Sequence, residues 1–163
     1  MPQTILVAID DSSCARKALQ QAVSLAASTQ ARLEILHVVD YGYLKYDLGY
    51  VDAGALGPQL VVAGEELLRD AAAAADAAGV SCGVHLVNDV LTLGDIPSAV
   101  RQAASECKAD MIVIGTHGRH GLRRLLLGSV AESLARECEV PVLLVREPAA
   151  AAGGQQAEAR AAA

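Results

Sequence analysis

A glycine-rich stretch in the last third of the chain has the residue types of a phosphate-binding loop. Its glycines follow the spacing Gly115-x2-Gly118-x9-Gly128, and Ser129 comes next. Glycines let successive backbone N–H groups turn toward an anion and approach it closely, and a helix start adds unpaired donors and the positive end of its dipole. A Cβ on Gly128 is expected to stand where the phosphate approaches. Positive charge is added by Arg119, Arg123 and Arg124.

The helix that follows this loop is predicted to begin with a capping box. Ser129 would be the N-cap, with Glu132 three residues later. The Glu132 carboxylate would then compete with phosphate for the same N-terminal donors. Two simpler interpretations stay open: the glycines serve only a tight turn, and Ser129 only caps its helix.

The spacing is neither a Walker A loop, which needs Gly-Lys-Ser/Thr, nor the dinucleotide fingerprint. It resembles the nucleotide-binding signature of the universal stress protein family, in the subset whose members hold ATP. The run Leu126-Leu-Gly-Ser-Val-Ala-Glu132 and the later run Val140-Pro-Val-Leu-Leu-Val145 are also similar to that family. The resemblance covers residues 4–146.

A second polar group, Asp10-Asp11-Ser12-Ser13, follows an apolar run near the N-terminus. The resemblance implies that Asp10 binds a ribose hydroxyl; capping of the next helix is the alternative for this carboxylate. Asp11 stands where the family commonly has glycine, which would crowd or repel phosphate. The resemblance also implies that the backbones of Ala8 and Val38 lie against adenine.

His117 is expected either to donate to phosphate or to lie in solvent on its loop. The complete predicted nucleotide site comprises Ala8, Asp10, Val38, Ile114, Gly115, Thr116, His117, Gly118, Arg119, Gly128, Ser129 and Val130.

Strands that alternate with helices must position these residues. Short apolar runs predict strands at 5–9, 33–39, 81–87, 111–114 and 141–145, with the more polar run 81–87 at an edge. Helical spacing predicts helices at 15–26, 57–78, from 96 to about 107, and 129–138. This pattern indicates an α/β fold with an open, mainly parallel sheet. The resemblance implies the strand order 3-2-1-4-5, Rossmann-like, with a crevice where the first and fourth strands end.

Length and composition limit the domain count, the type of core, the partners and the location that the chain can be expected to have. The 163 residues fit one domain, expected to span 1–147, with an Ala/Gly-rich and disordered tail at 148–163. Apolar residues make up 53% and aromatic ones 2%, so the core is expected to be aliphatic. A net charge of −6 without a basic block disfavours nucleic acid. No apolar run suits a membrane span or signal peptide, so a cytoplasmic protein with reduced cysteines is expected.

All four aromatic residues fall in one segment: Tyr41, Tyr43, Tyr46 and Tyr50. One hypothesis is a flap at 41–56 that closes over the nucleotide; the alternative is a fixed surface loop whose tyrosines pack on the Ala-rich helix or line a partner surface.

The sequence therefore predicts a stress-response binding module that holds ATP, with Mg²⁺ arriving on the nucleotide, and signals to an unknown protein partner. The alternative is a slow ATPase or an ATP-dependent phosphoryl or nucleotidyl transferase; no catalytic triad or metal-ligand spacing supports it. A third interpretation is a fold that works without nucleotide. A homodimer through the last strand is also expected, because Val142, Leu143, Leu144 and Val145 are too apolar for an exposed edge.

Overall fold

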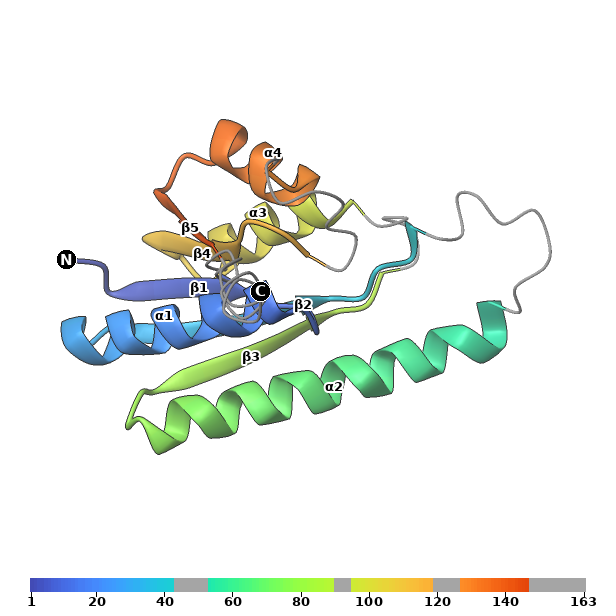
Figure 1. Cartoon of the computed structure of the whole chain (residues 1–163), viewed down its shortest axis with the longest axis horizontal. Helices are drawn as coiled ribbons and strands as arrows, with labels where there is room; N and C mark the ends of the chain where they lie inside the picture. The colour runs from blue at the N-terminus through green and yellow to red at the C-terminus, as the bar shows by residue number, and fades with distance from the viewer. Residues whose placement is uncertain (43–52, 90–94, 119–126, 147–163) are drawn as a thin grey trace, which may run out of the picture.

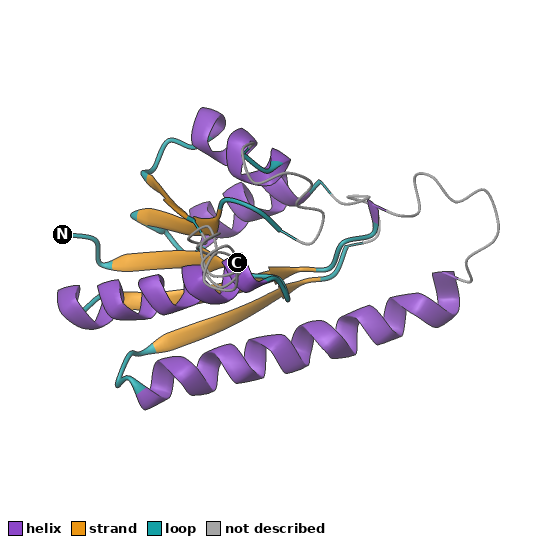
Figure 2. Ribbon diagram, in the orientation of Figure 1, coloured by secondary structure: helices purple, strands orange, loops and turns teal. Residues whose placement is uncertain are grey.

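The computed structural model describes residues 1–42, 53–89, 95–118 and 127–146, and these form an open parallel sheet covered by helices on both faces (Figures 1 and 2). The strands are β1 (Thr4–Ala8), β2 (Arg32–Val38), β3 (Cys82–Val87), β4 (Met111–Gly115) and β5 (Val142–Val145), in the order β3-β2-β1-β4-β5. The helices are α1 (Ser13–Thr29), α2 (Ala53–Ala77), α3 (Ile96–Glu106) and α4 (Ser129–Glu137). The predicted fold class and strand order are confirmed.

The two faces of the sheet have separate aliphatic cores. On one face, side chains of β1 and β2 such as Val7 and Ile35 pack with α1 and α2. On the other, Leu6 and Leu36 pack with α3 and α4. Ile5, Leu6 and Val7 are fully buried, which explains why β1 reads as an uninterrupted apolar run rather than an alternating one.

Local signals set most helix ends. Ser12 caps α1 by accepting from the Ala15 N–H, and Gly79, at φ +70, follows the end of α2 in the left-handed conformation that glycine adopts most readily. Helix α2 begins at Ala53 and not at residue 57 as predicted, with Pro58 inside it. The five residues before Pro58 include Gly54 and Gly57, which are weak helix formers, so local propensity does not indicate this earlier start.

A buried carboxylate, Glu34, lies on β2. Glu34 is 5% exposed and accepts hydrogen bonds from Arg32 Nε and, over 2.7 Å, from His85 Nε2. Gly83 lies opposite Glu34 and leaves the room that this carboxylate fills. Burial alone would raise the pKa of Glu34, but the two hydrogen bonds outweigh it, and the pKa is lowered from its ordinary value.

The tyrosine segment is described only in part. Tyr41 is buried and donates its hydroxyl to Asn88 Oδ1 over 2.6 Å. Tyr43, Tyr46 and Tyr50 lie outside the described residues, as does the predicted tail at 148–163.

All four cysteines are free thiols, with Cys14 buried and the other three half-buried. Within the described ranges, no helix has the length and apolar character to cross a membrane.

Candidate functional site

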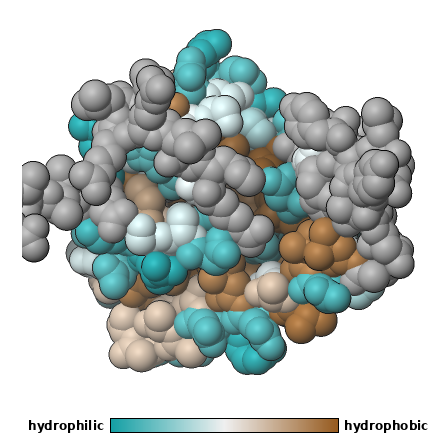
Figure 3. All heavy atoms as spheres, turned by 45° about the vertical axis from the view of Figure 1, so that its right-hand side comes forward, coloured by the Kyte–Doolittle hydropathy of each residue, from teal (hydrophilic) through white to brown (hydrophobic). Residues whose placement is uncertain are grey.

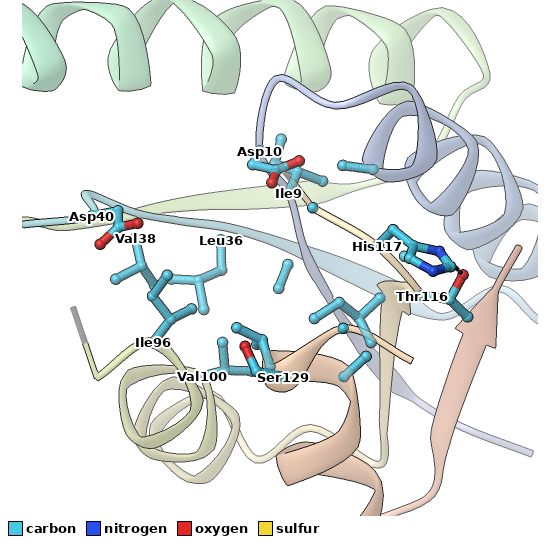
Figure 4. A pocket seen from close by; sticks show the side chains of 18 of the residues that line it. Ile9, Asp10, Leu36, Val38, Asp40, Ile96, Val100, Thr116, His117 and Ser129 are labelled. Carbon is cyan, nitrogen blue, oxygen red and sulfur yellow. Dashed lines mark hydrogen bonds between the residues drawn. The ribbon is translucent and has the colours of Figure 1, made fainter. Parts of the chain in front are cut away.

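A cavity of about 370 Å³ opens at the carboxyl ends of β1, β2 and β4, between the two helical layers (Figure 4). Figure 3 turns this side of the molecule toward the viewer, where apolar described side chains show between polar ones. Every predicted site residue that is described lines the cavity: Ala8, Asp10, Val38, Ile114, Gly115, Thr116, His117, Gly118, Gly128, Ser129 and Val130. Arg119, together with Arg123 and Arg124, lies outside the described residues.

Sheet topology creates this cavity. Ala8, the last residue of β1, pairs with Leu36 on one side and Ile114 on the other. From β1 and β4 the chain then runs to helices on opposite faces of the sheet. Such a topological switch point leaves a crevice beyond the strand ends, which is where open α/β sheets bind ligands.

The backbone of Val38 presents one donor and one acceptor to the cavity. Ile9 N–H donates to the Leu36 carbonyl, whereas Val39 N–H donates to Val87 on the other side of β2. Peptide directions alternate along a strand, so the N–H and C=O of Val38 point, like those of Leu36, toward β1. Because β1 ends opposite Leu36, no strand residue lies across from Val38 on that side.

The two sequence motifs meet at Asp10. Asp10 Oδ1 accepts from the Ser12 N–H over 3.0 Å, and a Cβ on Gly118 would lie 2.8 Å from Asp10 Oδ2. Since Ser12 Oγ is the α1 cap, the capping alternative for Asp10 is wrong. The carboxylate instead stands on the cavity wall beside the glycine loop.

The predicted capping box is wrong. The N-cap of α4 is Gly128, Ser129 is the first helical residue, and no side chain of a described residue caps this helix. Glu132 accepts from the Arg136 guanidinium one turn later, so its carboxylate does not turn back to the helix start. The first N–H groups of α4 thus remain as donors beside the cavity, with the positive end of the helix dipole.

The motif glycines serve close backbone packing more directly than ligand approach. Gly128 N–H donates to the Thr116 carbonyl over 2.8 Å, and a Cβ on Gly128 would lie 3.0 Å from that oxygen. A side chain at position 128 would therefore meet the Thr116 carbonyl, a contact that the glycine spacing alone does not predict. Gly115 likewise packs on Cys14, whose backbone and Sγ would lie 3.0–3.2 Å from an added Cβ. The Gly128 contact brings the start of α4 to the end of β4, and the Gly115 contact brings β4 against the start of α1.

His117 is not a solvent-exposed side chain. Its Nδ1 shares a 3.0 Å hydrogen bond with Thr116 Oγ1, and the ring lies beside Thr116, at the opposite end of the cavity from Val38 and Ile96 (Figure 4). Among the buried side-chain nitrogen and oxygen atoms of the described residues, Nε2 of His117 is the one without a hydrogen-bond partner. Such an atom is costly unless a ligand or water satisfies it.

Some cavity residues escaped the sequence interpretation. They are Ile9, Ala15, Leu36, His37, Asp40, Ile96, Val100, Leu127 and Ala131. Asp40 lies two residues beyond Val38, a spacing that keeps both on one side of an extended chain, and that signal could have found it. His37 could not be found this way, because its Nδ1–H donates to the Ile9 carbonyl, a contact that only the fold creates.

Metal ligands are not gathered in the described residues, where no three His, Cys, Asp or Glu side chains lie together as a metal site would need.

The family model described as the universal stress protein family matches residues 1–146. A universal stress protein of Methanocaldococcus jannaschii is 30% identical over 147 residues, which cover 88% of this chain and 82% of that protein. A solved universal stress protein family structure from Burkholderia pseudomallei is 35% identical, with a TM-score of 0.72 and coverage of 88% of this chain and 95% of that chain.

A third relative was solved as a universal stress protein in complex with cAMP. It is 28% identical, has a TM-score of 0.63, and aligns over 89% of this chain and 97% of that chain. The family match, the sheet order and the cavity agree, and the chain belongs to the universal stress protein family.

Proposed function

We propose that the cavity binds an adenine nucleotide, ATP in particular, and that the protein acts as a regulatory binding module in a stress response. The observation that carries this proposal is the order of groups along one cavity. The unpaired backbone edge of Val38, the Asp10 carboxylate and the uncapped start of α4 suit a base, a ribose and phosphates respectively. The relative solved with cAMP supports an adenine nucleotide as the ligand class.

The base end of the cavity fits adenine. Its walls are apolar side chains of β2 and α3: Leu36, Val38, Ile96 and Val100 (Figure 4). The Val38 N–H can donate to adenine N1, and its C=O can accept from the 6-amino group. Guanine presents the opposite pattern, an N1–H donor and an O6 acceptor, and would leave both backbone groups without a partner.

The phosphate end combines backbone donors with side chains. The N–H groups of α4 and the Ser129 hydroxyl can donate to phosphate oxygens, and the partnerless Nε2 of His117 lies at this end. Arg119, Arg123 and Arg124 would add positive charge. Magnesium that arrives with ATP can take its ligands largely from phosphate oxygens and water.

The alternative, a slow ATPase or ATP-dependent transferase, would use the same cavity and differs only in whether bound ATP is turned over. Experiments on one preparation of the purified protein can distinguish the two functions. Mass spectrometry of the denatured, purified protein should identify an adenine nucleotide, and calorimetric titration should rank ATP, AMP and cAMP.

Phosphate release measured over hours at saturating ATP and Mg²⁺ would favour the enzyme. Binding without release supports the regulatory module. If calorimetry detects no binding of any of the three nucleotides, the proposed function is wrong.

We also propose that the protein forms a homodimer through β5. This strand is at the edge of the sheet, and Leu143 exposes 38% of its surface there. An unpaired apolar edge is a template for pairing with another strand, and a second copy of β5 supplies a matching one.

A further inference from the structure

We infer that Asp40 selects the base, by accepting a hydrogen bond from the 6-amino group of adenine. This inference rests on the proposed nucleotide site and names the side chain that distinguishes adenine from other purines within it. Neither the glycine motif nor the Asp10 motif includes this residue.

Asp40 stands at the base end of the cavity. It lines the cavity wall two residues after Val38. Figure 4 shows its carboxylate beside the Val38 side chain and near Ile96, whereas Thr116 and His117 lie at the far end. Asp10 lies on another wall, toward α1, so the two carboxylates serve different parts of a ligand.

The local turn holds the Asp40 carboxylate in place. Its Oδ1 accepts from the Gly42 N–H over 2.7 Å, and a Cβ on Gly42 would lie only 2.8 Å from the same oxygen. Aspartate side chains commonly accept from the backbone two residues on in such turns. An ionised carboxylate offers about four acceptor positions, so it can accept from the turn N–H and from a ligand at the same time.

A hydrogen-bond acceptor at this place distinguishes adenine from guanine and hypoxanthine by the group at position 6 of the purine. The 6-amino group of adenine has two N–H bonds: one can reach the Val38 carbonyl on the N1 side, and the other can reach Asp40 on the N7 side. Guanine and hypoxanthine carry a carbonyl oxygen at the same position, which would face a carboxylate with no proton between them. A carbonyl oxygen facing a carboxylate is repelled by its charge and forfeits the hydrogen bond that the 6-amino group makes, which costs more than a neutral mismatch does.

The test is a calorimetric cycle of two nucleotides and three proteins. ATP is compared with purine riboside triphosphate, which lacks the 6-amino group, in the unmodified protein, Asp40→Ala and Asp40→Asn. We expect Asp40→Ala to weaken ATP binding about ten- to a hundredfold and to leave purine riboside triphosphate nearly unchanged, since only ATP can donate to the carboxylate.

Asp40→Asn keeps an acceptor for the Gly42 turn and removes the charge, so its expected loss is selective for ATP but smaller. Asp10→Asn is the matched control and should weaken both nucleotides by the same factor. Melting temperatures of all variants check the fold, and Asp40→Asn remains informative if Asp40→Ala does not fold.

Equal weakening of both nucleotides by the Asp40 variants, or no weakening of either, would overturn the role of Asp40 while the nucleotide site stands. If the unmodified protein binds neither nucleotide, the proposed function fails and this inference fails with it.

Discussion

Asp10 and Gly118 lie in contact at the cavity although they come from the loops after β1 and β4: a Cβ on Gly118 would stand 2.8 Å from Asp10 Oδ2. The contact joins the acidic motif to the glycine loop at one place. Gly118 is therefore needed for its lack of a side chain beside the carboxylate, a reason that the glycine spacing alone does not reveal.

Gly118→Ala is expected to weaken ATP binding about tenfold, because the new methyl group displaces the Asp10 carboxylate from its place on the cavity wall. Calorimetric titration measures the loss. Gly57→Ala is the matched control, since its Cβ would meet only Tyr41 at an ordinary 3.8 Å, away from the cavity. ATP affinity equal to that of Gly57→Ala would show that the Asp10 position does not matter for binding.

Gly128→Val is expected to abolish measurable ATP binding and to lower the free energy of unfolding by about 1–3 kcal/mol. The cause is contact and not backbone strain, because Gly128 has φ −64 and ψ 149, which valine also adopts. The added side chain pushes the start of α4 from the Thr116 carbonyl. Denaturant titration and calorimetry measure both effects, and undiminished affinity in a folded variant would reject the phosphate site.

Ser129→Ala separates the capping hypothesis from the ligand-binding one. Loss of an N-cap serine costs about 1 kcal/mol of stability, but Ser129 is not the cap of α4, so we expect a change below about 0.5 kcal/mol. ATP binding should weaken severalfold through the lost hydroxyl. Thermal unfolding with and without ATP measures both quantities. A loss of about 1 kcal/mol of stability with unchanged ATP affinity would show instead that Ser129 caps α4 and does not bind the nucleotide.

The sequence predicts the strands well because their signals are strong and local: uninterrupted apolar runs such as Ile5–Ile9 are typical of buried strands. The position of the cavity follows from the strand order. The predicted N-cap of α4 is one residue late, because Ser129 and Glu132 satisfy the capping-box pattern while Gly128 takes the cap position. His37 depends on its contact with the Ile9 carbonyl, in a segment distant in the chain, and no local pattern encodes such a contact.

Glu34 predicts a specific acid sensitivity. Its pKa is lowered in the folded protein, so its ionised form contributes stability that is complete above the ordinary carboxyl value of 4.5 and is lost as pH falls through the lowered value. Glu34→Gln should therefore be less stable at neutral pH, by about 1–3 kcal/mol, and should lose less stability below pH 4.5.

Urea unfolding across this pH range measures the effect. The remaining acid dependence includes Asp110, whose pKa is lowered by hydrogen bonds from the Thr4 and Gln3 N–H groups. Glu132→Gln is the control, because its ion pair with Arg136 is exposed and contributes little. Parallel pH profiles for the Glu34 variant and the unmodified protein would contradict the prediction.

Leu143→Glu should separate the proposed homodimer. Leu143 lies in the middle of β5, exposed on the face that carries α1, and antiparallel pairing of two β5 edges would place it near its copy. Two carboxylates at that contact would repel each other and would not be solvated as well as in the monomer. Sedimentation velocity at micromolar protein should show a dimer for the unmodified chain and a monomer for the variant.

The opposite edge of the sheet provides the control. Val84 on β3 is 51% exposed, more than Leu143, so Val84→Glu introduces the same charge at a comparably exposed edge strand. It should leave the dimer intact if β5 is the interface. A dimer that survives Leu143→Glu and dissociates in Val84→Glu would move the interface to β3. An unmodified protein that stays monomeric across micromolar concentrations would remove the dimer altogether and leave the nucleotide site unaffected.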